Sequence, residues 1–237
     1  MTLETIAHRC STKHTACGLF LLVMAVLLTG MPIQSQADQP GRGANAAVEV
    51  QYLAFIIDHH FSALRMTELA AGTDVTRDAD ISPSEGTSPS PDSAPTEAKA
   101  RLEPLKSLAR RNNRVQREEI LTAQRFLREW YGRSHTPQLT SEHQQDIEQL
   151  EGTATGDAFD IAFMQLLSRH HYEALPPSLQ CLVGADPQHD ELHRYCNNIV
   201  HAQVSDIQDM RHMLCEVYSL CDFQPSSEAR EESLKAQ

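Results

Sequence analysis

The stretch YLAFIIDHHFSAL, residues 52–64, decides the fold, because its pattern returns as FMQLLSRHHYEAL at residues 163–175. Both stretches place two adjacent histidines inside the same frame of aromatic and aliphatic residues. The alignment pairs His59 with His170 and His60 with His171. This repetition predicts that the chain is an internal duplication.

A second pair of segments supports the duplication. QREEILTAQRFL, residues 116–127, aligns with QVSDIQDMRHML, residues 203–214. The alignment pairs Gln116 with Gln203 and Glu119 with Asp206. The first segments lie 111 positions apart and the second segments 87, so the first copy carries 24 extra residues between its two segments. We place this insertion at residues 73–96, where Ser, Pro, Asp and Thr dominate, and expect it to be a disordered loop.

Composition limits the class of protein. The apolar content of 41% over 237 residues is enough for a hydrophobic core. A formal charge of -12 disfavours nucleic acid and anionic membranes as partners, because no segment supplies a basic patch. The acidic balance suits solubility or the binding of a cation.

The first 37 residues have the pattern of an export signal. Arg9 and Lys13 precede an apolar run at 18–28, and Ser35 and Ala37 offer small residues for cleavage. The run is short for a permanent membrane span, so we expect none after cleavage, with an uncleaved anchor as the alternative. The sequence therefore predicts export, to the periplasm or the extracellular space.

Four cysteines follow the expected cleavage site: Cys181, Cys196, Cys215 and Cys221. An even number in an exported protein predicts two disulfides. Cys181 to Cys196 would staple a helical hairpin, and Cys215 to Cys221 would close the last turn of the chain. A thiolate metal site is the alternative, although no Cys-x-x-Cys spacing is present.

Apolar residues recur every three or four positions and predict helices, with no alternating strand pattern. The expected helices cover 48–71, 104–131, 141–150, a stretch from about 157 that Pro176-Pro177 should end or kink, and 188–220. The fold class is all-α: four principal helices, arranged as two duplicated hairpins in a four-helix bundle. The expected parts are a signal at 1–37, a first repeat at 48–131, a connection at 132–156, a second repeat at 157–221 and a flexible tail at 222–237.

A polar layer is expected in the middle of this bundle. His59 and His170 fall within the apolar stripes of their helices, and each lies near a Gln and an acid of the partner helix. His60 and His171 should sit at the stripe edge, because adjacent helical residues are 100° apart. Imidazole, carboxylate and thioether are ligands for transition metals. The candidate metal ligands are His59, His60, Met66, His170, His171, Met210, Glu119 and Asp206.

The alternative is a hydrogen-bonded His/Gln/acid layer without a metal, in a non-catalytic structural or protein-interaction domain. Enzymatic function has little support. A ferritin-like di-iron site needs Glu-x-x-His on its helices, and this spacing is absent near the twin histidines. We therefore expect no catalytic residues.

The ordered motifs HHxxAL and then QxxEI or QxxDI resemble the bacterial domain-of-unknown-function family 305, over about residues 48–220. The resemblance implies a ferritin-like bundle, often in tandem, in exported proteins, some of which bind copper through His and Met. HHxxAxxM is intact from His59 to Met66, whereas Pro177 stands at the position equivalent to Met66 in the second copy. In the family a methionine follows the QxxEI motif. It is present as Met210 in the second copy, whereas Ala123 stands at the equivalent position in the first. The resemblance thus implies a copper-binding module with at most one or two composite sites.

Overall fold

The computed structural model describes residues 44–72 and 96–225. The chain divides into two units, Met1–Gln34 and Ser35–Gln237, and all described residues belong to the second. The expected export signal and nearly all of the expected insertion lie outside the described residues. No helix among the described residues is long and apolar enough to cross a membrane.

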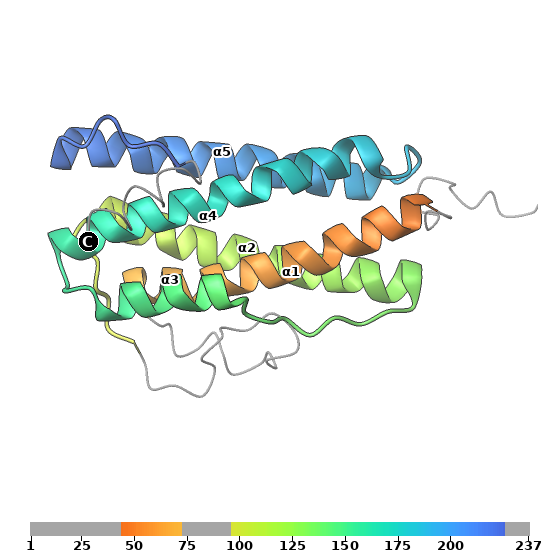
Figure 1. Cartoon of the computed structure of the whole chain (residues 1–237), viewed down its shortest axis with the longest axis horizontal. Coiled ribbons are helices and arrows are strands. Elements are labelled where there is room, and N and C mark those ends of the chain that lie inside the picture. The colour runs from red at the N-terminus through yellow and green to blue at the C-terminus, as the bar shows by residue number, and fades with distance from the viewer. Residues whose placement is uncertain (1–43, 73–95, 226–237) are drawn as a thin grey trace, which may run out of the picture. The chain divides into compact units, whose positions relative to one another are not determined.

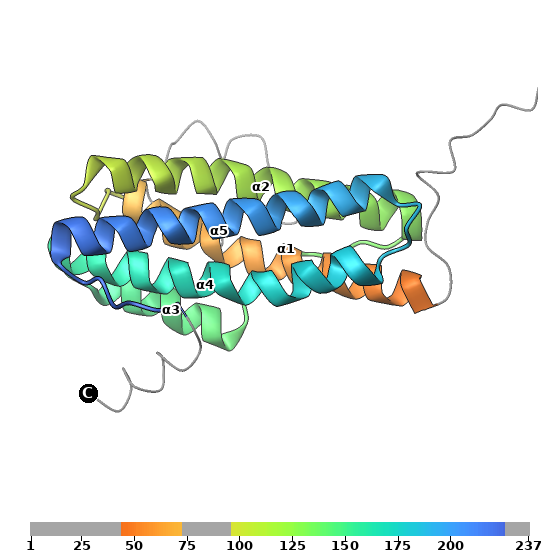
Figure 2. The ribbon, with the colours of Figure 1, turned by 90° about the horizontal axis from the view of Figure 1, so that it is seen from above.

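The described residues form five α-helices and no strand, so the fold is all-α as predicted. The helices are α1 (Ala44–Ala71), α2 (Glu103–Tyr131), α3 (Ser141–Gly152), α4 (Asp157–Gly184) and α5 (Asp190–Tyr218). α1 packs along α2, and α4 packs along α5 (Figures 1 and 2). α1 also contacts α4, and the short α3 lies against both.

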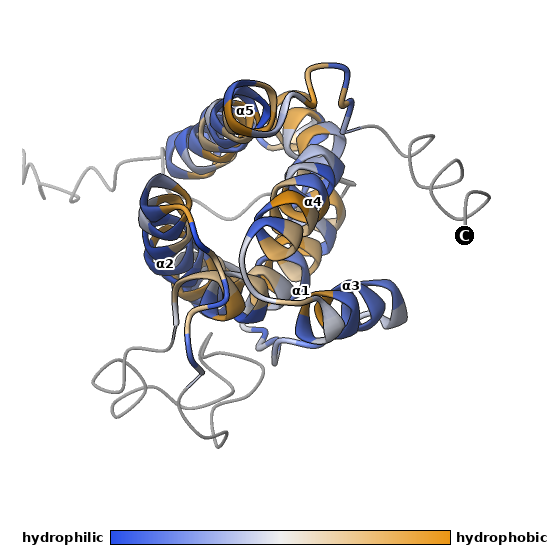
Figure 3. Cartoon of the chain, turned by 90° about the vertical axis from the view of Figure 1, so that its left-hand side faces the viewer, coloured by the Kyte–Doolittle hydropathy of each residue, from blue (hydrophilic) through white to orange (hydrophobic). Residues whose placement is uncertain are grey.

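The position of each helix follows from the distribution of its apolar residues. α1 is apolar around much of its circumference and is covered by α2, α3 and α4. α2 is amphipathic, and its predicted inward stripe is buried throughout: Leu105, Ala109, Asn112, Gln116, Ile120, Ala123 and Leu127. Seen along the helices, α2 and α5 are mostly hydrophilic and α4 is more hydrophobic (Figure 3).

Local signals set most helix ends where the sequence predicts them. α1 ends before Gly72 and α2 before Gly132, and both glycines adopt positive φ angles, 82° and 61°. The Thr140 side chain accepts a hydrogen bond from the His143 backbone N–H and caps α3.

Of the two outcomes predicted for Pro176-Pro177, an end or a kink of the third long helix, the first does not occur, because α4 continues through both prolines to Gly184. The two prolines remove the N–H donors that would bond the carbonyls of Tyr172 and Glu173. Tyr172 and Pro176 are exposed, so water can reach this side of the helix. Burial of the opposite side, including Ala174 and Ser178, holds the helix together.

Two disulfides are present, and both pairings agree with the prediction. Cys181 of α4 is bonded to Cys196 of α5, and Cys215 is bonded to Cys221. The first bond closes a loop of 15 residues. It restricts the unfolded chain and so stabilises the folded protein by about 3 kcal/mol.

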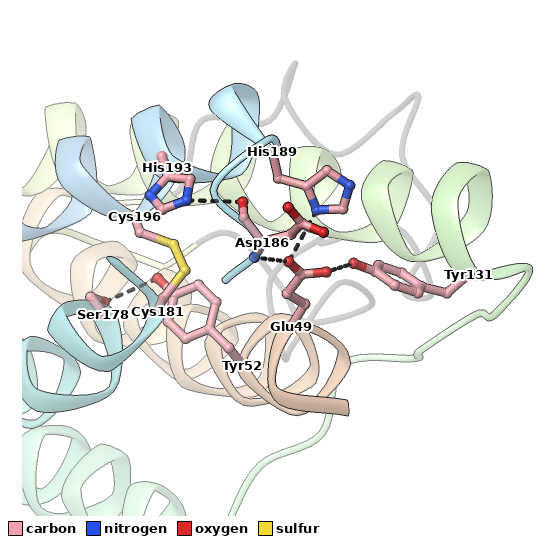
Figure 4. The surroundings of a disulfide bond; sticks show 9 residues. All are labelled: Glu49, Tyr52, Tyr131, Ser178, Cys181, Asp186, His189, His193 and Cys196. Carbon is pink, nitrogen blue, oxygen red and sulfur yellow. Dashed lines mark hydrogen bonds and ion pairs between the residues drawn. A yellow bond between two sulfur atoms is a disulfide. The ribbon is translucent and has the colours of Figure 1, made fainter. Parts of the chain in front are cut away.

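A buried carboxylate lies close to the Cys181–Cys196 disulfide (Figure 4). Glu49 of α1 accepts hydrogen bonds from the Asp186 backbone N–H at 2.7 Å and from Nδ1 of His189 at 3.0 Å. It also accepts one from the Tyr131 hydroxyl. The side chains of Glu49 and His189 are fully buried. This network ties the start of α1 to the end of α2 and to the α4–α5 turn, a contact that the sequence did not predict.

Candidate metal centre

A polar layer divides the interior of the described residues into two hydrophobic clusters. One cluster contains the first halves of α1 and α5 with the second halves of α2 and α4, and the other contains the complementary halves. The polar residues that separate them on the long helices include His59 and His60, Asn112 and Gln116, Ser168, His170 and His171, and Gln203 and Asp206. The layer therefore lies at mid-bundle, where the sequence predicts it.

The first histidine of each pair faces its counterpart across the α1–α4 contact. The ring centroids of His59 and His170 are 3.8 Å apart. Nε2 of His59 donates to the backbone carbonyl of His170 at 2.9 Å, and Nε2 of His170 donates to that of His59 at 3.0 Å. Ser62 adds a contact of 2.8 Å between its hydroxyl and Nε2 of His170. The two histidines therefore join α1 to α4 by reciprocal contacts.

A third histidine, His143 of α3, completes a cluster that the sequence did not predict. Its ring centroid lies 5.4 Å from that of His59 and 5.0 Å from that of His170. One ring nitrogen of each of the three lies within 4.8 Å of those of the others, and all three residues are buried. A signal was present in the sequence, since His143, Ile147 and Leu150 share one face of the short helix.

Hydrogen bonding fixes the tautomer of two rings of this cluster, those of His59 and His170. A carbonyl oxygen only accepts, so Nε2 of His59 and Nε2 of His170 carry their protons. The Nδ1 atoms of these two rings are then unprotonated in the neutral form, and Nδ1 of His59 lies 3.5 Å from Nδ1 of His60. Nδ1 of His143 and Nδ1 of His170 have no hydrogen-bond partner among the described residues. Metal-ligating histidines commonly donate their other ring N–H to a carbonyl or carboxylate, and His59 and His170 have that pattern. Nε2 of His143 lies 3.5 Å from Oε2 of Glu173.

Burial keeps the two facing imidazoles uncharged. It lowers the pKa of His59 well below its ordinary value, and neighbouring histidines, His60 first, lower it further. Burial also lowers the pKa of His170, followed by the effect of His59. Neutral imidazole is the form that binds metal ions.

The second histidines point to the other side of the layer, toward acids on α2 and α5. Nε2 of His60 lies 3.0 Å from Oε2 of Glu119, and Nε2 of His171 lies 3.6 Å from Oδ2 of Asp206. Nε2 of His171 also lies 3.0 Å from Oδ1 of Asn112. The expectation that His60 and His171 sit at the stripe edge is wrong, because both side chains are 0% exposed.

The partners of the acids are also the reverse of the prediction. The sequence predicts Glu119 and Asp206 beside His59 and His170, whereas they lie beside the second histidine of each pair. Burial raises the pKa of Asp206, but His171 and Arg111 outweigh this effect and hold the pKa below its usual value. Burial lowers the pKa of His171, which Asp206 partly restores.

The two candidate methionines are buried in the hydrophobic cluster on one side of the layer. Met66 and Met210 are both 0% exposed and pack with Phe163, Met164 and Leu214. The sulfur of Met210 accepts a hydrogen bond from the Ser168 hydroxyl at 3.7 Å. The structure thus brings the histidines together and places these sulfurs among apolar side chains.

Solved structures with a similar fold include forms of CopM. "CopM in the Cu(II)-bound form" has a TM-score of 0.52 and 19% identity, covering 69% of this chain and 93% of that chain. "CopM in the Cu(I)-bound form" has a TM-score of 0.52 and 19% identity, covering 72% and 97%. "CopM in the Ag-bound form (by co-crystallization)" has a TM-score of 0.52 and 20% identity, with the same coverage. At these identities the likeness shows the fold alone.

A family model described as "Domain of unknown function (DUF305)" matches residues 93–214. The match begins before α2, includes α3 and α4, and ends within α5. None of the curated proteins matches the chain. Because the family model covers just over half of the sequence, the chain belongs to the DUF305 family.

Proposed function

We propose that this chain is an exported, non-enzymatic protein that binds a transition metal, copper first, through His59, His143 and His170. The observation that carries the proposal is the buried cluster of three imidazoles, with one nitrogen of each within 4.8 Å of the others. The cluster takes His59 and His170 from the predicted ligands and adds His143.

The donor set fits such a metal. Imidazole suits copper, zinc, nickel and iron, and copper forms the most stable divalent complexes of the first-row series. The Nδ1 atoms of His143 and His170 are buried without a hydrogen-bond partner among the described residues, which is unfavourable unless a ligand binds them. CopM, solved with Cu(II) and with Cu(I), supports copper as the first metal to test.

The other predicted ligands have different roles in this proposal. His60 and His171, with Glu119 and Asp206, form polar pairs outside the cluster. Met66 and Met210 would have to leave their apolar surroundings to reach a metal bound there. A composite His/Met site is therefore less well supported than an all-imidazole site.

The finer description of the fold is part of the same proposal: a ferritin-like four-helix bundle of two duplicated hairpins, α1–α2 and α4–α5. Equivalent residues make equivalent contacts, which supports the duplication. His59 and His170 bond to each other's backbone, and His60 and His171 each lie near the acid at the aligned position. The single family match neither adds to this proposal nor opposes it.

Export is proposed from the disulfides together with the signal pattern. Two disulfides, Cys181–Cys196 and Cys215–Cys221, suit an oxidising compartment such as the periplasm. Mass spectrometry of the unreduced protein isolated from its host tests this step. Four free thiols would contradict it.

Copper titration of the purified chain tests the metal site. We expect about one equivalent to bind to the wild type, as for a single three-imidazole centre. His143→Ala should abolish this stoichiometric binding, because the substitution removes one of the three ligands. His143 also lies outside both repeats. His201→Ala, which changes an exposed histidine of α5, is the matched control and should leave binding unchanged. Equal binding by His143→Ala and the control would overturn the assignment.

A structural layer is the second candidate, and the reciprocal bonds between His59 and His170 favour it. These bonds join α1 to α4 and stabilise their register without a metal. If this is the only role, copper should not bind at micromolar concentration, while replacing His59 should still lower the melting temperature.

A further inference from the structure

We propose that a cleft between α2 and α5 binds an oxygen-preferring divalent cation, at a site separate from the three-imidazole cluster. α2 and α5 run side by side (Figure 2), and the cleft between them has a volume of about 390 Å³. Its lining includes two glutamines, three acids and one arginine: Gln116, Gln203, Glu119, Asp206, Asp209 and Arg111.

Two buried amide oxygens in the lining lack a donor. Gln116 and Gln203 are 1% and 2% exposed, and Oε1 of each has no hydrogen-bond partner among the described residues. Nε2 of Gln116 donates to Oδ1 of Asn112 at 3.1 Å, which fixes the orientation of this amide and leaves its oxygen as the spare group. A buried acceptor without a donor is unfavourable. Both amides belong to side chains that line the cleft, so a ligand bound there could satisfy these oxygens.

The charge of the lining selects a cation. Glu119, Asp206 and Asp209 supply three carboxylates against the single guanidinium of Arg111. This guanidinium bonds to Oδ1 of Asp206 at 2.8 Å and lies 3.6 Å from Oδ2 of Asp209, so it neutralises only part of the charge. Glu119 faces the imidazole of His60 instead. The spare oxygens therefore lie in a region of net negative charge.

The types of donor indicate the class of cation. Carboxylates and amide carbonyls are hard oxygen donors, which suit Mg²⁺, Ca²⁺ and Mn²⁺. The cleft is much larger than a bare ion, and Glu119 and Asp206 do not join a close group of three ionisable ligands among the described residues. The cation would thus retain several waters, and these would bridge to the side chains.

The site is independent of the proposed copper site. The copper cluster comes from α1, α3 and α4, whereas Gln116, Glu119, Gln203 and Asp206 all belong to α2 and α5. The two sites also differ in donor type, with imidazole nitrogen in one and oxygen in the other. Each can therefore be tested without the other.

Mn²⁺ is the probe for this site, measured by electron paramagnetic resonance of the free ion. We expect one Mn²⁺ to bind the purified chain with a dissociation constant below about 1 mM. Glu119→Gln should weaken binding about tenfold or more, since it removes a charge that faces the cation. Gln203→Met removes one spare oxygen at similar volume, so it should weaken Mn²⁺ binding and raise the melting temperature of the metal-free protein.

Gln180→Met is the matched control, because Gln180 is exposed on α4, away from the cleft. It should change neither Mn²⁺ affinity nor the melting temperature. Copper stoichiometry is measured on the same variants and should stay at the wild-type value, which separates this proposal from the copper site. Absence of saturable Mn²⁺ binding overturns the proposal, as does unchanged affinity in Gln203→Met. If Glu119→Gln does not fold, Gln203→Met alone decides.

Discussion

At the scale of single residues, the two histidines of each pair are adjacent in the sequence, and this explains why they lie in two different environments. Neighbouring residues on a helix point about 100° apart, so a twin histidine that is wholly buried must face two different helices. His59 and His170 face each other and α3, while His60 and His171 face α2 and α5. The layer then has a nitrogen-rich cluster on one side and two histidine–acid pairs on the other.

The lowered pKa values predict a pH dependence of the metal-free protein. Burial lowers the pKa of His59, His170 and His171, so these rings stay neutral in the folded chain. In the unfolded chain the histidine pKa is near 6.5, so the same rings take up protons below that pH. Stability is therefore complete above about pH 7 and falls as pH drops below 6.5, by about 1.4 kcal/mol per pH unit for each histidine. Urea denaturation of metal-free protein between pH 7.5 and 5 measures this slope.

His59→Gln should reduce that slope, whereas the exposed control His201→Ala should retain it. The lowered pKa of Asp206 acts only below its ordinary value near 4 and does not affect this window. A free energy of unfolding that stays constant from pH 7 to 5 would contradict the assignment of these rings as neutral and buried.

Glu49 carries a second residue-scale prediction. Glu49→Gln keeps the volume but replaces a carboxylate that accepts three hydrogen bonds by an amide with one acceptor oxygen. The Tyr131 hydroxyl then loses this acceptor, and His189 loses its carboxylate partner. We expect the free energy of unfolding to fall by about 2–4 kcal/mol. Urea denaturation checks this, with the exposed Glu148→Gln of α3 as the control, expected within about 0.5 kcal/mol of wild type. Equal stability of the two variants would show that the network contributes little.

At the scale of helices, the sequence predicts what depends on local periodicity. The stripe from Leu105 to Leu127 predicts both that α2 forms and which of its faces points inward. Gly72 and Gly132 predict the ends of α1 and α2. Burial of His60 depends instead on how closely α2 approaches α1, which no local pattern contains. His143 was missed for a related reason, because its partners come from other helices.

Pro176 lies inside α4, although proline disfavours the interior of a helix. Its replacement measures how much this proline lowers the free energy of unfolding. Pro176→Ala restores an N–H that can donate to the Tyr172 carbonyl, and Pro176 is exposed, so no core contact is lost. We expect the free energy of unfolding to rise by about 1–2 kcal/mol, less than the intrinsic penalty because proline also restricts the unfolded chain. Pro187→Ala, in the α4–α5 turn, should instead lower it slightly. Equal shifts in both variants would mean that α4 has adapted fully to its prolines.

At the scale of the whole molecule, the two hairpins differ in one covalent feature. The second hairpin has Cys181 bonded to Cys196, and the aligned positions of the first hairpin are Ala70 and Ala109. Both alanines are 0% exposed and belong to the same hydrophobic cluster. If the hairpins are true copies, these two positions are placed as the two cysteines are, with Cα atoms about 6 Å apart, a distance that disulfides commonly span.

This equivalence predicts that Ala70→Cys with Ala109→Cys forms a disulfide in the first hairpin. The bond would close a longer loop than Cys181–Cys196, because the first hairpin contains the 24-residue insertion, so it should stabilise the protein by up to about 4 kcal/mol. Mass spectrometry of tryptic peptides under non-reducing conditions identifies the bond, and urea denaturation measures its effect. Ala70→Cys with Ala123→Cys pairs positions from different clusters and should leave two free thiols. Free thiols in the first variant would show that the hairpins are not built alike, and the duplication would then have to be abandoned.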